Sequence, residues 1–257
     1  MDAFPLFEWT YGRWLLVFLR ISLLLVMAPF YGLPNVPARL RLGLAAILAF
    51  AIAPTIAAPE MTGIGAIFLL GLKEAAVGVL FGLVLSVLFA AAQTAGHLTG
   101  LQMGLGLANM VDPLQRIQMN ILGQVYHLIA MLLFLAVDGH HFILQALVHS
   151  FDVVPIDGWS LTTVAVDALI RQTANVFLLA IQLAAPVMGA LLATSAGLGL
   201  VARTVPQMNV FIVGFPVKIG LGFLVMWLSL PFFGHGVQTA WNTLQQDALS
   251  ILAAVGS

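Results

Sequence analysis

The sequence predicts an all-α integral membrane protein, and three observations support this prediction. Of the 257 residues, 61% are hydrophobic and 7% are charged, whereas about a quarter of the residues in a soluble domain are charged. The apolar residues form long runs, most of which end near glycine or proline. Small residues recur inside these runs at the spacing by which membrane helices pack together. Polar side chains are therefore too few to cover a surface that faces only water.

The charge balance and the missing cysteines exclude several classes of function. The formal net charge is −1, and nucleic acid requires clustered Lys and Arg, so we expect no nucleic-acid partner. The absence of cysteine excludes disulfides and thiolate metal sites. The first 14 residues lack the basic segment and the small-residue cleavage site of a secretory signal, so we expect them to be retained.

Six apolar runs are long enough to cross a bilayer, because a spanning helix needs about 20 mostly apolar residues. Pro34 and Pro59 end the first two runs. The third and the fifth are longer than a bilayer requires. In chain order, the predicted helices cover residues 14–33, 42–58, 64–95, 119–137, 164–193 and 210–233.

The loops between these runs predict an orientation. Loops with Lys or Arg alternate with loops that carry acids and no Lys or Arg, namely those around Glu60 and over 138–159. Cytoplasmic loops are enriched in Lys and Arg, so both termini are predicted to face away from the cytoplasm. The arginines that set this orientation are Arg39, Arg41, Arg116 and Arg203.

Four charged residues lie inside or against the apolar runs: Arg20, Lys73, Glu74 and Lys218. Each costs about 2.5–3.5 kcal/mol at a helix centre on insertion scales, so such side chains usually face protein or water. Lys73 and Glu74 are neighbours and diverge by about 100° on a helix, so they cannot pair face to face. One interpretation is snorkelling combined with an ion pair between helices. The other is a polar path, or a contact between subunits, through the membrane region.

Small residues predict close helix packing in the third and fifth runs. Gly78 and Gly82 begin a four-residue repeat, and Gly96 and Gly100 continue it on a neighbouring track. This spacing lets helix backbones approach each other in a membrane. Further residues with the same spacing are Ser86, Ala90, Gly104, Gly189, Ala193 and Gly197.

The segment "GLQMGLGLANMVDP" (100–113) concentrates three glycines in seven residues and has a counterpart, "GLGLVARTVP" (197–206). In both, glycines loosen the helix and a proline stops it. A nucleotide site requires a strand before the glycines, or a Gly-Lys-Ser/Thr ending, and neither is present. The segment is therefore either a movable element or a static turn between helices.

Residues that resemble catalytic or metal sites do not combine into one in the sequence. "VDGHHF" contains Asp138, His140 and His141, with His149 further along, but adjacent histidines on a helix are expected to diverge. We therefore interpret Asp138 as the cap of a short helix. Ser195 has no histidine beside it, and HExxH is absent. No catalytic, cofactor-binding or metal residue is predicted, and an enzyme is not expected.

Five segments together resemble the FliR family, flagellar biosynthetic proteins of the type III export gate with injectisome counterparts. The resemblance covers nearly the whole chain, and the "DGH…SF" piece looks flagellar. One departure is Ser195, where family members often carry Asn or Asp. The segments are "FLRISLLLVMAPFYG" (18–32), "LKEAAVGVLFG" (72–82), "TAGHLTGLQMGLGLANMVDP" (94–113), "FLAVDGHHFILQALVHSF" (134–151) and "GLVARTVPQMNVFIVGFPVKIGLG" (199–222).

This resemblance implies a non-enzymatic export-gate domain over 1–257, with a P-like helical portion (1–160) followed by a Q-like helical hairpin (161–257). It implies assembly with P- and Q-type gate subunits and further export proteins, without a cofactor. Unfolded flagellar proteins would pass through that gate. The expected location is the bacterial inner membrane, crossed several times and in contact with lipid, at the flagellar basal body.

The resemblance also implies that a loop near 104–118 plugs the closed channel. The residues assigned to this plug are Gly104, Gly106, Met110, Asp112 and Pro113. Flexible methionine thioethers suit such a role because they seal irregular gaps.

Two alternative functions remain open at this point. In a small-solute secondary transporter, the two GLGL…P segments would be broken helices and Glu74 would carry the coupling proton. A membrane scaffold would differ from an export-gate subunit only in its partners.

Overall fold

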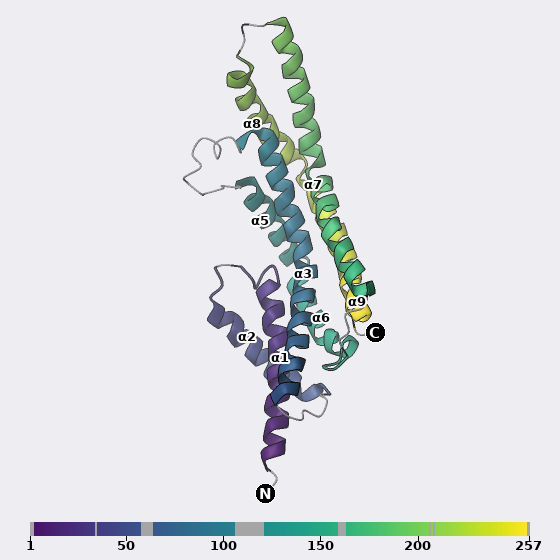
Figure 1. The fold of residues 1–257 in the computed structure, drawn as a ribbon. Coiled ribbons are helices and arrows are strands. Elements are labelled where there is room, and N and C mark those ends of the chain that lie inside the picture. The colour runs from purple at the N-terminus through teal and green to yellow at the C-terminus, as the bar shows by residue number, and fades with distance from the viewer. Residues whose placement is uncertain are drawn as a thin grey trace. The chain divides into compact units, whose positions relative to one another are not determined.

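The computed structural model describes residues 3–33, 35–57, 64–105, 121–158, 163–205, 207 and 209–255. These residues form α-helices and one short 3-10 helix and contain no strand, as predicted for an all-α protein (Figure 1). The elements in chain order are α1 (Ala3–Met27), α2 (Ala38–Ile52), η1 (Ala53–Thr55), α3 (Ile64–Met103), α5 (Ile121–Ala136), α6 (Gly139–Val153), α7 (Thr163–Thr204), α8 (Val210–Leu228) and α9 (Leu230–Val255).

Proline and glycine set several of the helix boundaries. Pro37 immediately precedes α2, where its missing N–H costs nothing. The helix α3 ends where Gly104 adopts a φ of +86°, a left-handed conformation that favours glycine. Pro186 and Pro216 instead lie inside α7 and α8. A proline therefore did not always mark a helix end in this chain.

Among the described residues, three helices are long and apolar enough to cross a membrane, or up to five if each bent pair counts as one span. The three are α2 with η1, α3 and α7, whereas the sequence predicted six runs. The run over 210–233 is divided between α8 and α9, and α5 is followed by α6 across a second sharp bend. The first predicted run, which carries Arg20, is not counted among these spans.

The chain divides into two compact units, each built from segments that are distant in sequence. Unit 1 comprises Met1–Val87, Leu135–Thr173 and Asn242–Ser257. Its core is formed by buried side chains of α1, the first part of α3, and α6, such as Ile21, Val77 and Leu147. In this unit α2 lies against α1 (Figure 1).

Unit 2 comprises Leu88–Phe134 and Ala174–Trp241. Aromatic edge-to-face contacts join its helices: Phe134 lies 5.5 Å from Phe89 and 5.0 Å from Trp241 between ring centroids, and Tyr126 lies 5.0 Å from Phe233. The predicted division at residue 160 stays a prediction, because proximity in space does not reveal which segments are P-like or Q-like.

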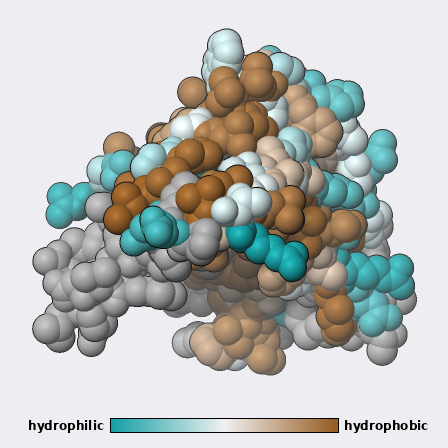
Figure 2. Space-filling model, turned by 90° about the horizontal axis from the view of Figure 1, so that it is seen from above, coloured by the Kyte–Doolittle hydropathy of each residue, from teal (hydrophilic) through white to brown (hydrophobic). Residues whose placement is uncertain are grey.

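Large apolar side chains are exposed on several helices. Examples are Phe50 of α2 at 78%, Ile212 of α8 at 71% and Trp227 of α8 at 67% exposure. Figure 2 shows apolar residues gathered in continuous patches on the visible face, with hydrophilic residues beside them. A monomer in water rarely exposes so much apolar surface, so these faces fit contact with lipid or with other proteins.

Candidate functional site

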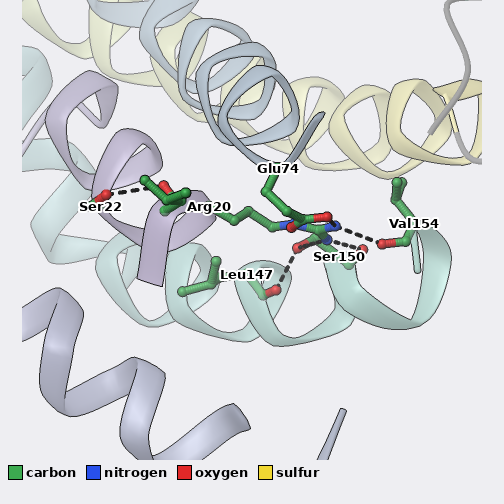
Figure 3. A network of polar contacts seen from close by, with 7 residues as sticks. Arg20, Ser22, Glu74, Leu147, Ser150 and Val154 are labelled. Atoms are coloured by element: carbon green, nitrogen blue, oxygen red, sulfur yellow. Dashed lines mark hydrogen bonds and ion pairs between the residues drawn. The ribbon is translucent and has the colours of Figure 1, made fainter. Parts of the chain in front are cut away.

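The centre of unit 1 is an ion pair between α1 and α3. The Nε of Arg20 donates to Oε2 of Glu74 at 2.6 Å, and its Nη2 donates to Oε1 at 3.0 Å (Figure 3). Arg20 is 1% exposed and Glu74 is fully buried. The two parallel bonds use the planar guanidinium and carboxylate in the geometry that gives the strongest pairing. Of the three embedded cations that the sequence offered, Arg20 is therefore the partner of Glu74.

The remaining donors of Arg20 reach the end of α6. Its Nη1 donates to the backbone oxygen of Ser150 at 2.9 Å, and its Nη2 donates to that of Val154 at 2.9 Å (Figure 3). The last carbonyls of a helix lack partners within the helix and carry partial negative charge, so a cation is favourable there. The Arg20 guanidinium also lies 4.1 Å from the ring centroid of Phe151. The arrangement fixes α1, α3 and α6 to one another.

Glycine allows α3 to approach α1 at this point. A Cβ added at Gly78 would lie 2.5 Å from the backbone oxygen of Arg20, and one at Gly82 would collide with Cβ of Met27. Gly78 lies one turn beyond Glu74 on α3. The close helix contact and the ion pair are thus parts of one arrangement. The sequence indicated both features separately but contained no signal that they meet.

The other two embedded cations differ in their surroundings. Lys73 places its Nζ 3.4 Å from Oδ1 of Asp157, and both side chains are partly in solvent. Lys218 of α8 is half-buried, and no ion pair or hydrogen bond joins it to any other described residue. Lys218 is therefore an embedded cation without a counter-charge in the described part of the chain.

The predicted plug segment begins at a tightly packed helix end in unit 2. Gly104 turns the chain at the end of α3, and a Cβ there would collide with the ring of Phe215 from α8. Met103 is fully buried, and a Cβ added at Gly222 would lie 2.8 Å from its side-chain atoms. The other plug residues, Gly106, Met110, Asp112 and Pro113, lie outside the described residues.

The C-terminal flank of this segment packs in the same buried core as its N-terminal flank. Leu122, near the start of α5, belongs to a buried cluster with Met103, Val187 and Leu191. A Cβ at Gly96 would collide with the backbone oxygen of Leu122, whereas one at Gly100 would make an ordinary 3.7 Å contact with that side chain. Both ends of the 106–120 segment are therefore anchored in one core.

The same glycine spacing on α7 has a different environment. A Cβ at Gly189 or at Gly197 would meet no described atom within 4 Å, and both residues are exposed. The four-residue repeat of the fifth run therefore makes no close helix contact within the described chain.

The "VDGHHF" residues lie at the start of α6. Asp138 occupies the cap position, but its side chain makes no cap hydrogen bond, because its backbone is left-handed with φ 55°. Its Oδ1 lies 3.4 Å from Nδ1 of His141. The expectation that the adjacent histidines diverge is wrong, since the ring centroids of His140 and His141 lie 4.2 Å apart. Both residues lie in the first turn of α6, and helical rotation fixes the directions of their Cα–Cβ bonds but not the positions of the rings.

Residues 11–244 match the model of a protein family described as bacterial export proteins, family 1. The chain belongs to this family. It is similar to the flagellar biosynthetic protein FliR of Bacillus subtilis (strain 168), with 36% identity over 260 residues that cover 100% of this chain and 98% of the relative. The Escherichia coli (strain K12) FliR is 35% identical over 242 residues, with 92% of each chain covered.

A third relative, the FliR of Aquifex aeolicus (strain VF5), is 34% identical over 219 residues and 84% of each chain. The resemblance inferred from five sequence segments is therefore confirmed. Membership of a bacterial export family, together with several long apolar helices, identifies this chain as a membrane protein of an export apparatus.

Proposed function

We propose that this chain is a structural and gating subunit of the flagellar type III protein export channel. In this proposal it assembles with P- and Q-type subunits in the inner membrane at the basal body, and it catalyses no reaction. Family membership over residues 11–244 carries the proposal, because the curated relatives are named flagellar biosynthetic proteins. Unfolded flagellar proteins are the cargo that such a channel would conduct.

The packing of the two described flanks supports a role for residues 104–118 as the channel plug. Met103 and Leu122 hold the two flanks in one buried cluster. Gly104 supplies the change of direction, with Phe215 packed against it. A plug requires fixed flanks, because otherwise the residues between them would not return to the same place on closing.

The unpartnered features of unit 2 support assembly with other subunits. Lys218 has no counter-charge among described residues, and an unpaired cation in a membrane helix is costly. The exposed Gly189 and Gly197 of α7 offer the spacing by which helices associate, with no partner in the described chain. In this proposal, an acidic side chain of a P- or Q-type subunit pairs with Lys218, and a helix face of small residues packs against Gly189 and Gly197.

The geometry of Glu74 weighs against the secondary transporter. A coupling carboxylate must take up and release a proton during the transport cycle. Both carboxylate oxygens of Glu74 accept hydrogen bonds from Arg20, and the pair is buried. Protonation would break a bidentate ion pair and leave the guanidinium charge uncompensated. No described observation favours transport of a small solute.

Co-purification from native membranes tests the proposal. The chain carries a C-terminal tag, is extracted in mild detergent, and its companions are identified by mass spectrometry. We expect P- and Q-type export proteins in one large particle. A Lys218→Met variant should yield less of this particle, whereas Lys73→Met should not, because Lys73 already has Asp157 within 3.4 Å.

Recovery of the chain alone, or as a small homo-oligomer, would contradict the proposal. Recovery with P- and Q-type proteins but equal yields from both lysine variants would retain the gate and exclude Lys218 as an assembly contact.

A further inference from the structure

Three side chains capable of binding a metal ion gather at the start of α6. Asp138, His140 and His141 each offer one ligand atom, and these atoms all lie within 4.8 Å of one another. In the described ranges of the chain this is the one such group. All three residues belong to unit 1, so their relative placement does not depend on unit 2.

The backbone at Asp138 keeps its carboxylate available. Asp138 is the one non-glycine residue with positive φ among those the structure describes, with φ 55° and ψ 30°. In this conformation the side chain makes no hydrogen bond to the first N–H groups of α6. Its Oδ1 instead lies 3.4 Å from Nδ1 of His141, with both side chains largely in solvent. A carboxylate in the ordinary capping geometry would be occupied by the helix.

His140 is the most enclosed of the three residues. It is half-buried, and its Nδ1 is buried without a hydrogen-bond partner. Ring nitrogens of a buried histidine usually find a partner, and metal-binding histidines use one nitrogen for the ion. Its ring lies beside that of His141, with centroids 4.2 Å apart and planes tilted by 37°. The two imidazoles are thus held together rather than spread around the helix.

The charge of the group suits a divalent ion. One carboxylate and two neutral imidazoles carry a net charge of about −1, which offsets the partial positive charge of about +0.5 at a helix N-terminus. Imidazole nitrogen favours Zn²⁺, Cu²⁺ and Ni²⁺ over Mg²⁺ or Ca²⁺, which prefer oxygen ligands. Zn²⁺ accepts this mixed set in a tetrahedral arrangement.

We propose that Asp138, His140 and His141 form a binding site for Zn²⁺, with water in the fourth position. The ligand atoms already lie within 4.8 Å of one another, so small side-chain rotations bring them around the ion. The bound ion ties the residue before α6 to the first turn of that helix. Because α6 also provides the carbonyls that receive Arg20, the site stabilises the start of a helix whose end belongs to the buried ion pair. This proposal is independent of the export function.

The test uses the full chain in lipid nanodiscs, purified without a polyhistidine tag. Zn²⁺ binding is measured by competition with a chromophoric chelator. We expect one Zn²⁺ per chain, and a loss of affinity of at least about tenfold in Asp138→Asn and in His141→Ala, since each removes one of three protein ligands. Asparagine tolerates the left-handed backbone, so Asp138→Asn keeps the local fold.

His149→Ala is the matched control. His149 is an exposed histidine of the same helix and lies 3.6 Å from Asp152 with the same sequence spacing, but no third ligand joins them. Its removal should leave Zn²⁺ affinity unchanged. Co²⁺ substitution gives a second measurement, because the absorption of tetrahedral Co²⁺ should be lost in His141→Ala and retained in His149→Ala.

The proposal is overturned if the chain does not compete with the chelator for one equivalent of Zn²⁺. Equal losses in His141→Ala and His149→Ala would also overturn it, because scattered surface histidines would then account for the binding. Ion-free thermal unfolding of the variants shows whether a loss reflects misfolding. If His141→Ala unfolds early without metal, Asp138→Asn alone decides the question.

Discussion

At the scale of single residues, the contacts of Arg20 explain how its charged side chain is accommodated at the buried centre of unit 1. It donates two hydrogen bonds to Glu74 and one each to the backbone carbonyls of Ser150 and Val154. Its guanidinium also lies over the ring of Phe151. Burying an ion pair is costly unless further hydrogen bonds satisfy the remaining protons. Here the end of α6 supplies them. The arrangement therefore specifies which helices pack together.

Replacing one partner of this pair should destabilise unit 1. In Glu74→Gln the guanidinium stays charged and buried without a counter-charge, and removing one partner of a buried pair costs about 3–5 kcal/mol. Lys73→Met on the same helix should cost less than about 1 kcal/mol, because its pair with Asp157 is exposed. Thermal unfolding in detergent measures both.

A double variant distinguishes lost charge balance from lost packing. Arg20→Met with Glu74→Leu removes both charges and should recover part of the stability lost in Glu74→Gln, since apolar replacement of a buried pair is often neutral or better. If Glu74→Gln unfolds at the same temperature as Lys73→Met, the buried pair is not what holds α1, α3 and α6 together.

Sequence reasoning could find these residues but not their pairing. Arg20 and Glu74 were conspicuous as charges in apolar runs, yet they lie 54 positions apart, and Arg20 and Lys218 were equally placed as partners. The carbonyls of Ser150 and Val154 have no sequence signal at all, because any residue carries a carbonyl. The histidine pair was misjudged because helical spacing fixes the directions of the Cα–Cβ bonds and leaves the ring positions to side-chain rotation.

At the scale of helices, the glycine repeat has two different meanings in one chain. On α3 the Cβ that Gly78 or Gly96 lacks would collide with a neighbouring backbone. On α7 a Cβ at Gly189 or Gly197, in the same spacing, would meet no described atom within 4 Å. The spacing alone therefore cannot tell a contact within the chain from a contact with another molecule. Only the positions of the other helices decide between them.

Two glycines one turn apart on α3 should respond differently to alanine. At Gly96 a Cβ meets the backbone of Leu122 and Gly123, which cannot move without α5, so Gly96→Ala should cost about 1–3 kcal/mol. At Gly100 the nearest atom is a Leu122 side-chain carbon at 3.7 Å. Gly100→Ala should be neutral or slightly stabilising, because alanine favours a helix by about 0.5–1 kcal/mol over glycine.

Both variants gain the same helix propensity, so the difference between their unfolding temperatures isolates the contact between α3 and α5. Equal stability of Gly96→Ala and Gly100→Ala would mean that α5 does not lie against α3 at Gly96. A second substitution on α5 should not restore the stability lost in Gly96→Ala, because the atoms that collide with the new Cβ are backbone atoms of α5.

At the scale of the whole molecule, some charged and apolar groups find their partners within the chain and others do not. Arg20 and Glu74 compensate each other inside unit 1, and Met103 and Leu122 close the core of unit 2. Lys218 and the apolar faces around Phe50 and Trp227 have no described partner of matching chemistry.

The helical class followed from the sequence because long apolar runs allow few other structures in a membrane. The bends between α5 and α6 and between α8 and α9 did not, since apolar composition continues through them.

The gating proposal makes its sharpest prediction for the segment between Leu105 and Ile121. Deleting residues 106–116 leaves four residues, 117–120, to join the flanks, and four residues span about 13–14 Å when extended. Met103 and Leu122, on the two flanks of the deletion, belong to one buried cluster. With P- and Q-type subunits present, membranes that contain the deletion variant should leak small ions, because the channel has lost its plug.

A matched variant replaces residues 106–116 with eleven glycines and serines and preserves the length of the connection. If the plug seals by its own side chains, such as Met110, this variant should also leak, as measured by ion flux into proteoliposomes that contain the co-purified complex. If neither variant changes permeability while both still co-purify with the P- and Q-type proteins, the segment is a static turn. Because Met103 and Gly104 remain in both variants, a leak cannot then be attributed to loss of the packing around Phe215 and Gly222.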